Sequence, residues 1–134
     1  MKTLRRTLLL GMVLPFFYWS MAAHAGPLTM AQTEINYLLD FIEISGCEFY
    51  RNGSWFDSTQ AHRHLRDKYA YLSSRNRIET AEDFITRAAK KSSLSGRPYQ
   101  VRCGVCTTTE TSEWLHAVLA RYRTVLARKS AVAR

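Results

Sequence analysis

The sequence predicts a small α+β domain, with four helices packed around a two-stranded antiparallel ribbon in the order α-β-α-α-β-α. Four segments place apolar residues at helical spacing, and two short segments between them are rich in strand-forming residues. The length of 134 residues is too short for a TIM barrel, which needs about 250 residues. A hydrophobic content of 46% is too high for an intrinsically disordered chain.

The first 25 residues have the pattern of a secretory signal peptide. A basic start precedes an apolar run over residues 8–19, and the pattern ends in Ala23-x-Ala25. The run is shorter than the roughly 20 apolar residues that a membrane-spanning helix needs. We therefore expect cleavage after Ala25, which leaves a single exported domain of residues 26–134 with no stable membrane span.

Export changes what the net charge implies. The whole chain has 19 Lys and Arg against 11 Asp and Glu, a formal net charge of +8. Three of these bases and none of the acids lie in the signal segment, so the exported domain carries +5. Its bases are spread over several elements, and we expect no nucleic-acid partner. The partner expected instead is an unknown envelope component or a periplasmic protein.

The first helix of the domain is predicted to begin at Thr29 and to end at Ser45-Gly46. Thr29 and Gln32 have the spacing of a capping box, and glycine commonly follows the last turn of a helix. The apolar residues between them recur at helical spacing, at Ala31, Ile35, Leu38, Leu39 and Ile42.

The two predicted strands are residues 47–51 and 99–103, which are short and rich in strand-forming residues. Asn52-Gly53 predicts a tight turn after the first of them. Trp55-Phe56 then either continues a hairpin or fills the space under a loop. Residues 104–111 are predicted as a loop with a threonine run.

Three further helices follow from caps and apolar spacing. Asp57 or Ser58 caps the second helix, Thr80 opens the third, and Ser112 with Glu113 begins the fourth. Their apolar positions are Ala61, Leu65, Tyr69 and Leu72, then Ala81, Phe84, Ile85 and Ala88, then Leu115, Val118, Leu119, Tyr122, Val125 and Leu126.

Three cysteines in an exported domain are first interpreted as disulfide partners. If the two strands pair antiparallel with position sums near 150, Cys47 lies opposite Cys103. A disulfide there closes a long loop, and the chain-entropy model assigns such a loop about 4 kcal/mol of stabilisation. We predict this pair, with Cys106 either free or replacing Cys103.

Two other roles for the cysteines have less support. Cys103 and Cys106 form a C-x-x-C motif, but catalytic pairs of this kind normally begin a helix, and this one ends a strand. Zinc bound by Cys47, Cys103, Cys106 and His116 has suitable ligand types, but its spacing is not that of a zinc finger. The sequence therefore predicts no metal site and no cofactor.

The densest polar cluster is the run from His62 to Arg66 on the second predicted helix. With Asp57, a histidine of this run can act as a base that a carboxylate orients. A basic helix face with one histidine at the margin of the core explains the same residues. The chain has no serine nucleophile motif and no glycine-rich phosphate loop, so we predict no catalytic residues.

Several motifs follow one another along the chain: Arg51-Asn52-Gly53, Ala61-x-x-His64-Leu65-Arg66-x-Lys68, Arg77-Ile78-x-Thr80-Ala81-Glu82-x-Phe84-Ile85 and Ser92-Ser93-x-Ser95-Gly96-Arg97-Pro98-Tyr99. In this order and spacing they resemble the YfeK-like family of small exported bacterial proteins, which carry a domain of unknown function. The resemblance covers roughly residues 31 to 121. It implies a signal peptide, a periplasmic location in a Gram-negative bacterium and no assigned activity.

The polar residues of these motifs form the candidate binding surface: Arg51 on the first strand, His64, Arg66 and Lys68 on the second helix, and Tyr99 beside the Ser-Gly turn. We predict a non-enzymatic periplasmic module that binds an envelope component or protein. One alternative is a small envelope hydrolase that uses His64 with a carboxylate. The other is a thiol/disulfide protein that uses Cys103 and Cys106.

Overall fold

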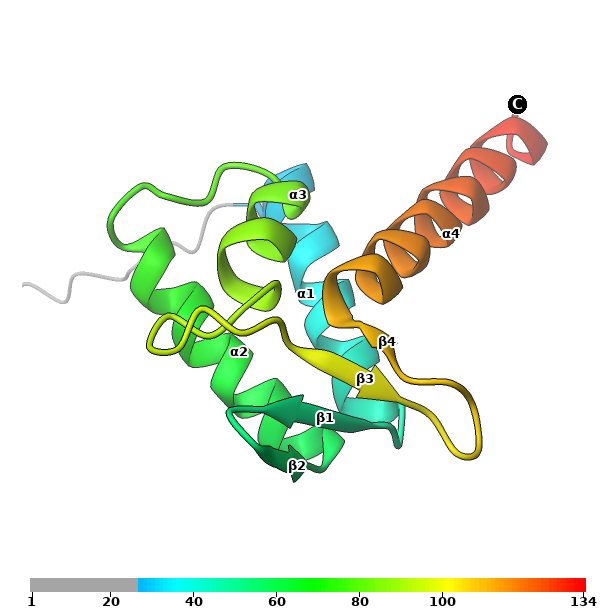
Figure 1. The fold of residues 1–134 in the computed structure, drawn as a ribbon. Helices are drawn as coiled ribbons and strands as arrows, with labels where there is room; N and C mark the ends of the chain where they lie inside the picture. The colour runs from blue at the N-terminus through cyan, green and yellow to red at the C-terminus, as the bar shows by residue number, and fades with distance from the viewer. Residues whose placement is uncertain (1–26) are drawn as a thin grey trace, which may run out of the picture.

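The structure is a computed structural model that describes residues 27–134, so the predicted signal peptide lies outside the described residues. The elements in chain order are α1 (Met30–Ile44), β1 (Glu48–Arg51), β2 (Ser54–Phe56), α2 (Ser58–Ser73), α3 (Ala81–Asp83), the π-helix η1 (Phe84–Ala89), β3 (Gln100–Arg102), β4 (Thr109–Glu110) and α4 (Thr111–Val132). In the view of Figure 1 the strands cross the lower part of the molecule, in front of the lower ends of α1 and α2, and the C-terminal part of α4 projects from the body.

The caps of the first two long helices are capping boxes. The Thr29 hydroxyl accepts a hydrogen bond from the backbone N–H of Gln32, and the Gln32 side chain accepts one from the backbone N–H of Thr29. At α2 the capping residue is Asp57, whose carboxylate pairs with Gln60 in the same way. The predicted helix starts at Thr29 and Asp57 are therefore confirmed.

The sheet has four antiparallel strands in the order β2-β1-β3-β4, so the prediction of a two-stranded ribbon is wrong. Each predicted strand is one arm of a hairpin. The second arms, Ser54–Phe56 and Thr109–Glu110, are three and two residues long. Strands this short are too brief to show the two-residue alternation of side chains in the sequence. They are recognised as strands only by their backbone pairing with β1 and β3. The predicted order α-β-α-α-β-α is wrong for the same reason.

The register between β1 and β3 is the predicted one. Phe49 lies opposite Val101, and the disulfide joins Cys47 to Cys103 just beyond the ladder. The two cysteines are separated by 56 positions in the sequence and their Cα atoms by 4.4 Å. Cys106 is unpaired and exposed.

The third predicted helix begins at Thr80 but changes its winding after one turn. α3 is three residues long and continues as the π-helix η1. The predicted apolar positions Ala81, Phe84, Ile85 and Ala88 are all fully buried, and Ala89 joins them. A π-turn holds an extra residue, so one more side chain faces the core than an α-helical spacing predicts.

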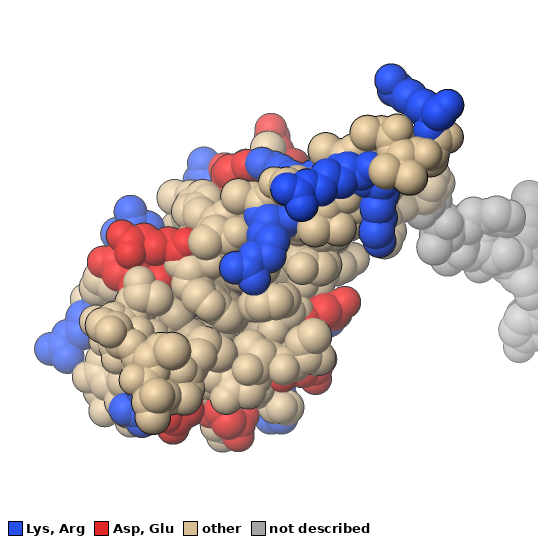
Figure 2. All heavy atoms as spheres, turned by 90° about the vertical axis from the view of Figure 1, so that its right-hand side faces the viewer, with Lys and Arg blue, Asp and Glu red and all other residues tan. Residues whose placement is uncertain are grey.

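α4 is attached to the body by its first half and projects with its second. Leu115, Val118 and Leu119 are buried in the common core, whereas beyond Arg123 only Leu126 is even partly buried. Figure 2 shows Lys and Arg side chains gathered along the projecting helix. Among residues 27–134, no helix has the length and apolarity needed to cross a membrane.

Candidate functional site

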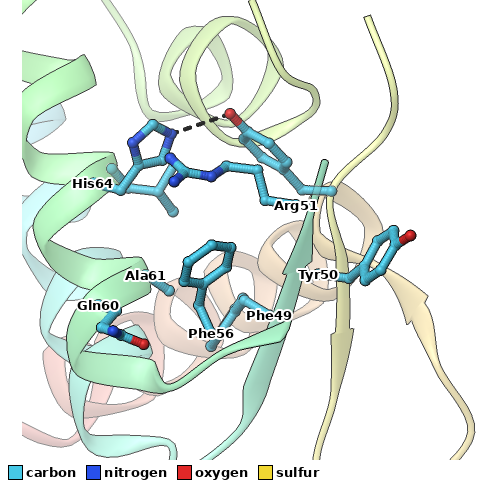
Figure 3. A pocket seen from close by; sticks show the side chains of 9 residues that line it. Phe49, Tyr50, Arg51, Phe56, Gln60, Ala61 and His64 are labelled. Atoms are coloured by element: carbon cyan, nitrogen blue, oxygen red, sulfur yellow. Dashed lines mark hydrogen bonds between the residues drawn. The ribbon is translucent and has the colours of Figure 1, made fainter. Parts of the chain in front are cut away.

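A pocket opens between α2 and the β1–β2 hairpin (Figure 3). The space between its walls is about 350 Å³, a figure that includes open solvent, so the pocket is a shallow one. The lining residues are Phe49, Tyr50, Arg51, Phe56, Gln60, Ala61, His64, Leu65 and Tyr99.

The periodicities of β1 and α2 explain which of their side chains face the pocket. Alternation along β1 turns Phe49 and Arg51 to the pocket, and Figure 3 shows the Tyr50 ring pointing away from it. On α2, Ala61 and Leu65 are one turn apart and buried, with His64 beside them. The floor of the pocket is therefore apolar. Arg51, His64 and Tyr99 lie along one rim, and Gln60 lies on the opposite side in Figure 3.

Arg51 crosses the upper side of the pocket in Figure 3. Its guanidinium carbon lies 4.8 Å from the centroid of the Phe56 ring, within the range of a cation–π contact. The contact orients the arginine across the apolar floor. The guanidinium therefore lies beside a hydrophobic cavity. Its attraction to an anionic group there is screened less than it would be in bulk water.

His64 and Tyr99 meet at the same rim, with 3.1 Å between His64 Nε2 and the Tyr99 phenol oxygen. Their rings are nearly perpendicular, at 80°. Lys68 lies one turn further along α2, and its ammonium group is 5.2 Å from the centroid of the Tyr99 ring. Lys68 also donates a 2.8 Å hydrogen bond to the backbone carbonyl of Lys91. The tyrosine is thus contacted by two polar side chains of α2.

The rim shifts the ionisation of its own groups. Burial lowers the pKa of His64 below 6.5, and the positive charges of Arg51 and Lys68 lower it further. The imidazole is therefore neutral at pH 7. Burial, followed by the charge of Arg51, also lowers the pKa of Lys68. Burial raises the pKa of the Tyr99 phenol, which stays protonated. An anion bound among these groups would offset the unfavourable proximity of the cations.

Two turns hold the hairpin and Tyr99 in place. The Ser92 hydroxyl is buried and accepts hydrogen bonds from the backbone N–H groups of Leu94 and Ser95. The Ser95 hydroxyl donates a 2.6 Å hydrogen bond to the side-chain oxygen of Asn52, in the tip of the β1–β2 hairpin. Asn52 and Gly53 both have positive φ, at 51° and 93°, as a two-residue hairpin turn requires. These polar residues therefore position the rim.

Comparison with known proteins gives a family but no activity. The sequence model of a family of unknown function, DUF5329, matches residues 29–123, a range that includes every residue of the pocket. The chain belongs to the DUF5329 family. The uncharacterized protein YfeK of Salmonella typhimurium is 47% identical over 51 residues, which cover 38% of this chain and 41% of YfeK. The resemblance to YfeK is therefore confirmed, and the match spans about two fifths of that relative. No solved structure matches the chain.

Four of the five predicted site residues come together in this DUF5329 domain: Arg51, His64, Lys68 and Tyr99. Arg66 lies apart from them, because residues two positions apart on a helix point to different sides. Its guanidinium contacts His62 instead, with Nε and Nη2 at 3.3 and 3.2 Å from His62 Nε2.

The half of the pocket opposite the Arg51 rim was not predicted as part of the site. Phe49, Phe56 and Gln60 line it, and none was proposed as a binding residue. One signal in the sequence pointed to Phe56. A two-residue turn at Asn52-Gly53 pairs Phe56 with Phe49 across the hairpin, which the observed register confirms.

The residues that a hydrolase or a thiol protein would use have other partners in the DUF5329 domain. His64 pairs with a phenol, and no carboxylate is among the residues that line the pocket. The Asp57 carboxylate accepts the backbone N–H of Gln60 at the start of α2. Cys103 is bonded to Cys47, so the two cysteines of the C-x-x-C motif, Cys103 and Cys106, form no disulfide with each other in the structure.

Proposed function

We propose that this protein is a non-enzymatic binding module of the periplasm, whose pocket takes a small envelope-derived anion with an apolar part. The observation that carries the proposal is the rim of Arg51, Lys68, His64 and Tyr99 beside an apolar floor, with no carboxylate among the lining residues. Cations that lower the pKa values of their neighbours favour an anion between them.

Each part of the pocket has a distinct role in this proposal. Arg51 makes the primary ion pair, because its planar guanidinium suits the two oxygens of a carboxylate or phosphate. Tyr99 and His64 offer neutral hydrogen-bonding groups beside it. Phe49 and Phe56 accept the apolar part, whose burial adds about 25 cal/mol for each Å² removed from water.

The periplasmic location is supported by two independent features. The segment before Ala25 has the charge, apolar run and cleavage pattern of a signal peptide. Disulfides such as Cys47–Cys103 form and persist in oxidising compartments and are rare in the cytosol. Fractionation of the native host, followed by N-terminal sequencing of the protein, tests this part. Gly26 as the first residue is the expected result, and an intact Met1 in the cytosolic fraction contradicts it.

The ligand class is tested with probes that share one chain and differ in the head group. Octanoate, octyl phosphate and n-octanol are titrated into the protein while the amide NMR signals of β1 and α2 are followed. We expect both anions to move these signals and n-octanol to do so at least tenfold more weakly. A preference for the carboxylate or the phosphate then assigns the head group. Equal affinity for all three, or signals that move elsewhere, contradicts the proposal.

Two variants make the test specific. Arg51→Gln removes the central cation and keeps a polar side chain, and we expect it to abolish the preference for anions over n-octanol. Arg66→Gln removes a cation from the other side of α2 and is the matched control. If both variants weaken anion binding equally, the effect reflects overall charge and the pocket is not the site.

A further inference from the structure

We propose that Asp40, Glu43 and His62 form a binding site for a divalent transition-metal ion. Asp40 and Glu43 lie three positions apart on α1, and His62 lies in the first half of α2. One carboxylate oxygen of each acid and a ring nitrogen of His62 all lie within 4.8 Å of one another. None of the three residues lines the pocket, so this site is separate from the proposed anion site.

The donor set suits a borderline ion better than magnesium or calcium. One imidazole nitrogen with two carboxylate oxygens is a set that zinc and its first-row neighbours accept, whereas Mg²⁺ and Ca²⁺ prefer oxygen alone. Three protein ligands leave coordination positions for water. The presence of a histidine also separates this arrangement from the surface clusters of acids that many proteins carry.

Packing makes the histidine the fixed member of the set. The His62 side chain is 12% exposed, whereas that of Glu43 is 46% exposed. α1 packs more extensively against α2 than against any other element, so the two backbones are held relative to each other. The carboxylates can therefore close onto a histidine that stays in place.

The closure required is small. His62 Nδ1 lies 3.8 Å from Glu43 Oε1. With zinc–ligand bonds of about 2.0–2.2 Å, two ligands of a tetrahedral site are separated by roughly 3.4 Å. A change of rotamer in Glu43 or Asp40, both of which are exposed, covers the difference.

Arg66 is the competitor for this site. Its guanidinium contacts His62 Nε2, so in the neutral ring this nitrogen accepts and Nδ1 carries the proton that faces Glu43. A metal ion at Nδ1 displaces that proton, and Nε2 then carries it. Nε2–H can no longer accept from Arg66, so the guanidinium must withdraw. Removing Arg66 is therefore expected to strengthen metal binding.

The test is a calorimetric titration of Zn²⁺ into protein purified from the periplasm without a histidine tag. We expect one saturable site with a dissociation constant on the order of micromolar, as suits three partly exposed ligands. His62→Gln and Asp40→Asn should each weaken it at least tenfold. Arg66→Gln should strengthen it by roughly tenfold, since one positive charge close to a divalent ion is removed.

The controls keep the test independent of folding and of the pocket. His116→Gln removes an exposed histidine of α4 and should leave zinc binding unchanged. Arg51→Gln should also leave it unchanged, because Arg51 belongs to the other site. Thermal unfolding in the presence of a chelator identifies any variant that fails to fold. Absence of saturable binding in both the unmodified protein and Arg66→Gln overturns the proposal, as does unchanged zinc affinity in a folded His62→Gln variant.

Discussion

Arg123 of α4 holds Glu34 of α1 in a two-point ion pair, with Nε and Nη2 each 2.7 Å from a carboxylate oxygen. The third nitrogen, Nη1, donates to Glu82 of α3 at 2.6 Å. One guanidinium thus ties the middle of α4 to two other helices. The Glu34 side chain is 7% exposed, and Arg123 is the one cation that it pairs with among residues 27–134.

Arg123→Met should destabilise the fold by about 2 kcal/mol, because it leaves the Glu34 carboxylate buried and unpaired. The figure is below that of a fully buried pair because the Arg123 side chain is 46% exposed. Urea unfolding measures the change. Arg121→Met, an exposed position two residues earlier, is the control and should change stability by less than about 0.5 kcal/mol. Equal losses in the two variants contradict this role.

The same cluster makes stability sensitive to acid. The hydrogen bond from Arg123 lowers the pKa of Glu82 below its ordinary value of 4.5. The folded form then holds the carboxylate charged to lower pH than the unfolded chain does. This contribution is therefore complete above about pH 4.5 and is lost as the pH falls through the folded pKa. Glu82→Gln should flatten the stability curve in that window, and an unchanged slope is the contrary result.

His64 should titrate below its usual range. Burial and the charges of Arg51 and Lys68 lower its pKa, so the unfolded chain takes up a proton near pH 6.5 before the folded form does. Stability from this group therefore decreases as the pH falls from 6.5 to the folded pKa. NMR titration of the imidazole should give a midpoint below 6.5.

The titration of His64 also reports on its neighbours. Arg51→Gln should raise the midpoint, since it removes the larger of the two cationic influences. Arg66→Gln should leave it unchanged. A bound anionic probe should raise it as well. If Arg51→Gln has no effect, then Arg51 is not close enough to His64 in solution to share a ligand with it.

The disulfide should account for much of the stability. It closes a loop over 56 positions, for which the chain-entropy model gives roughly 4 kcal/mol. The double variant Cys47→Ala with Cys103→Ala should lose most of this in urea unfolding, while Cys106→Ser should lose little. Thiol counting on the unfolded oxidised protein should find one free thiol, that of Cys106. Three free thiols would show that the pair does not form.

Features that depend on the spacing of residues along the chain were predictable. Capping spacing located the starts of α1 and α2, and strand alternation predicted the pairing of Phe49 with Val101 and hence the cysteine pair. Four of the five proposed site residues also lie together, and they come from motifs in three separate segments. Arg66 points away from them, towards His62, as its spacing of four residues from His62 on a helix already indicated.

The short strands and the π-helix depended on pairing and packing partners outside their own segments. Ser54–Phe56 and Thr109–Glu110 are strands because β1 and β3 offer them unpaired backbone groups. η1 winds more widely because its side chains pack into a core formed by α2 and α4. Propensity alone left Trp55-Phe56 open between a hairpin and a loop filler, and the hairpin is the observed outcome. It assigned residues 109–110 to a loop and residues 84–89 to an ordinary helix.

The sequence by itself determined where the helices begin and which of their faces are apolar, because both depend on spacing along the chain. It favoured the Cys47–Cys103 pair but left open whether Cys106 replaces Cys103, and the structure decided this. Only the tertiary structure decided that Arg51, His64 and Tyr99 share one rim over an apolar pocket. It also decided that His62 faces two carboxylates of α1. The physical reason is that both sites join side chains from separate elements, and their proximity follows from how the helices and the sheet pack around the core.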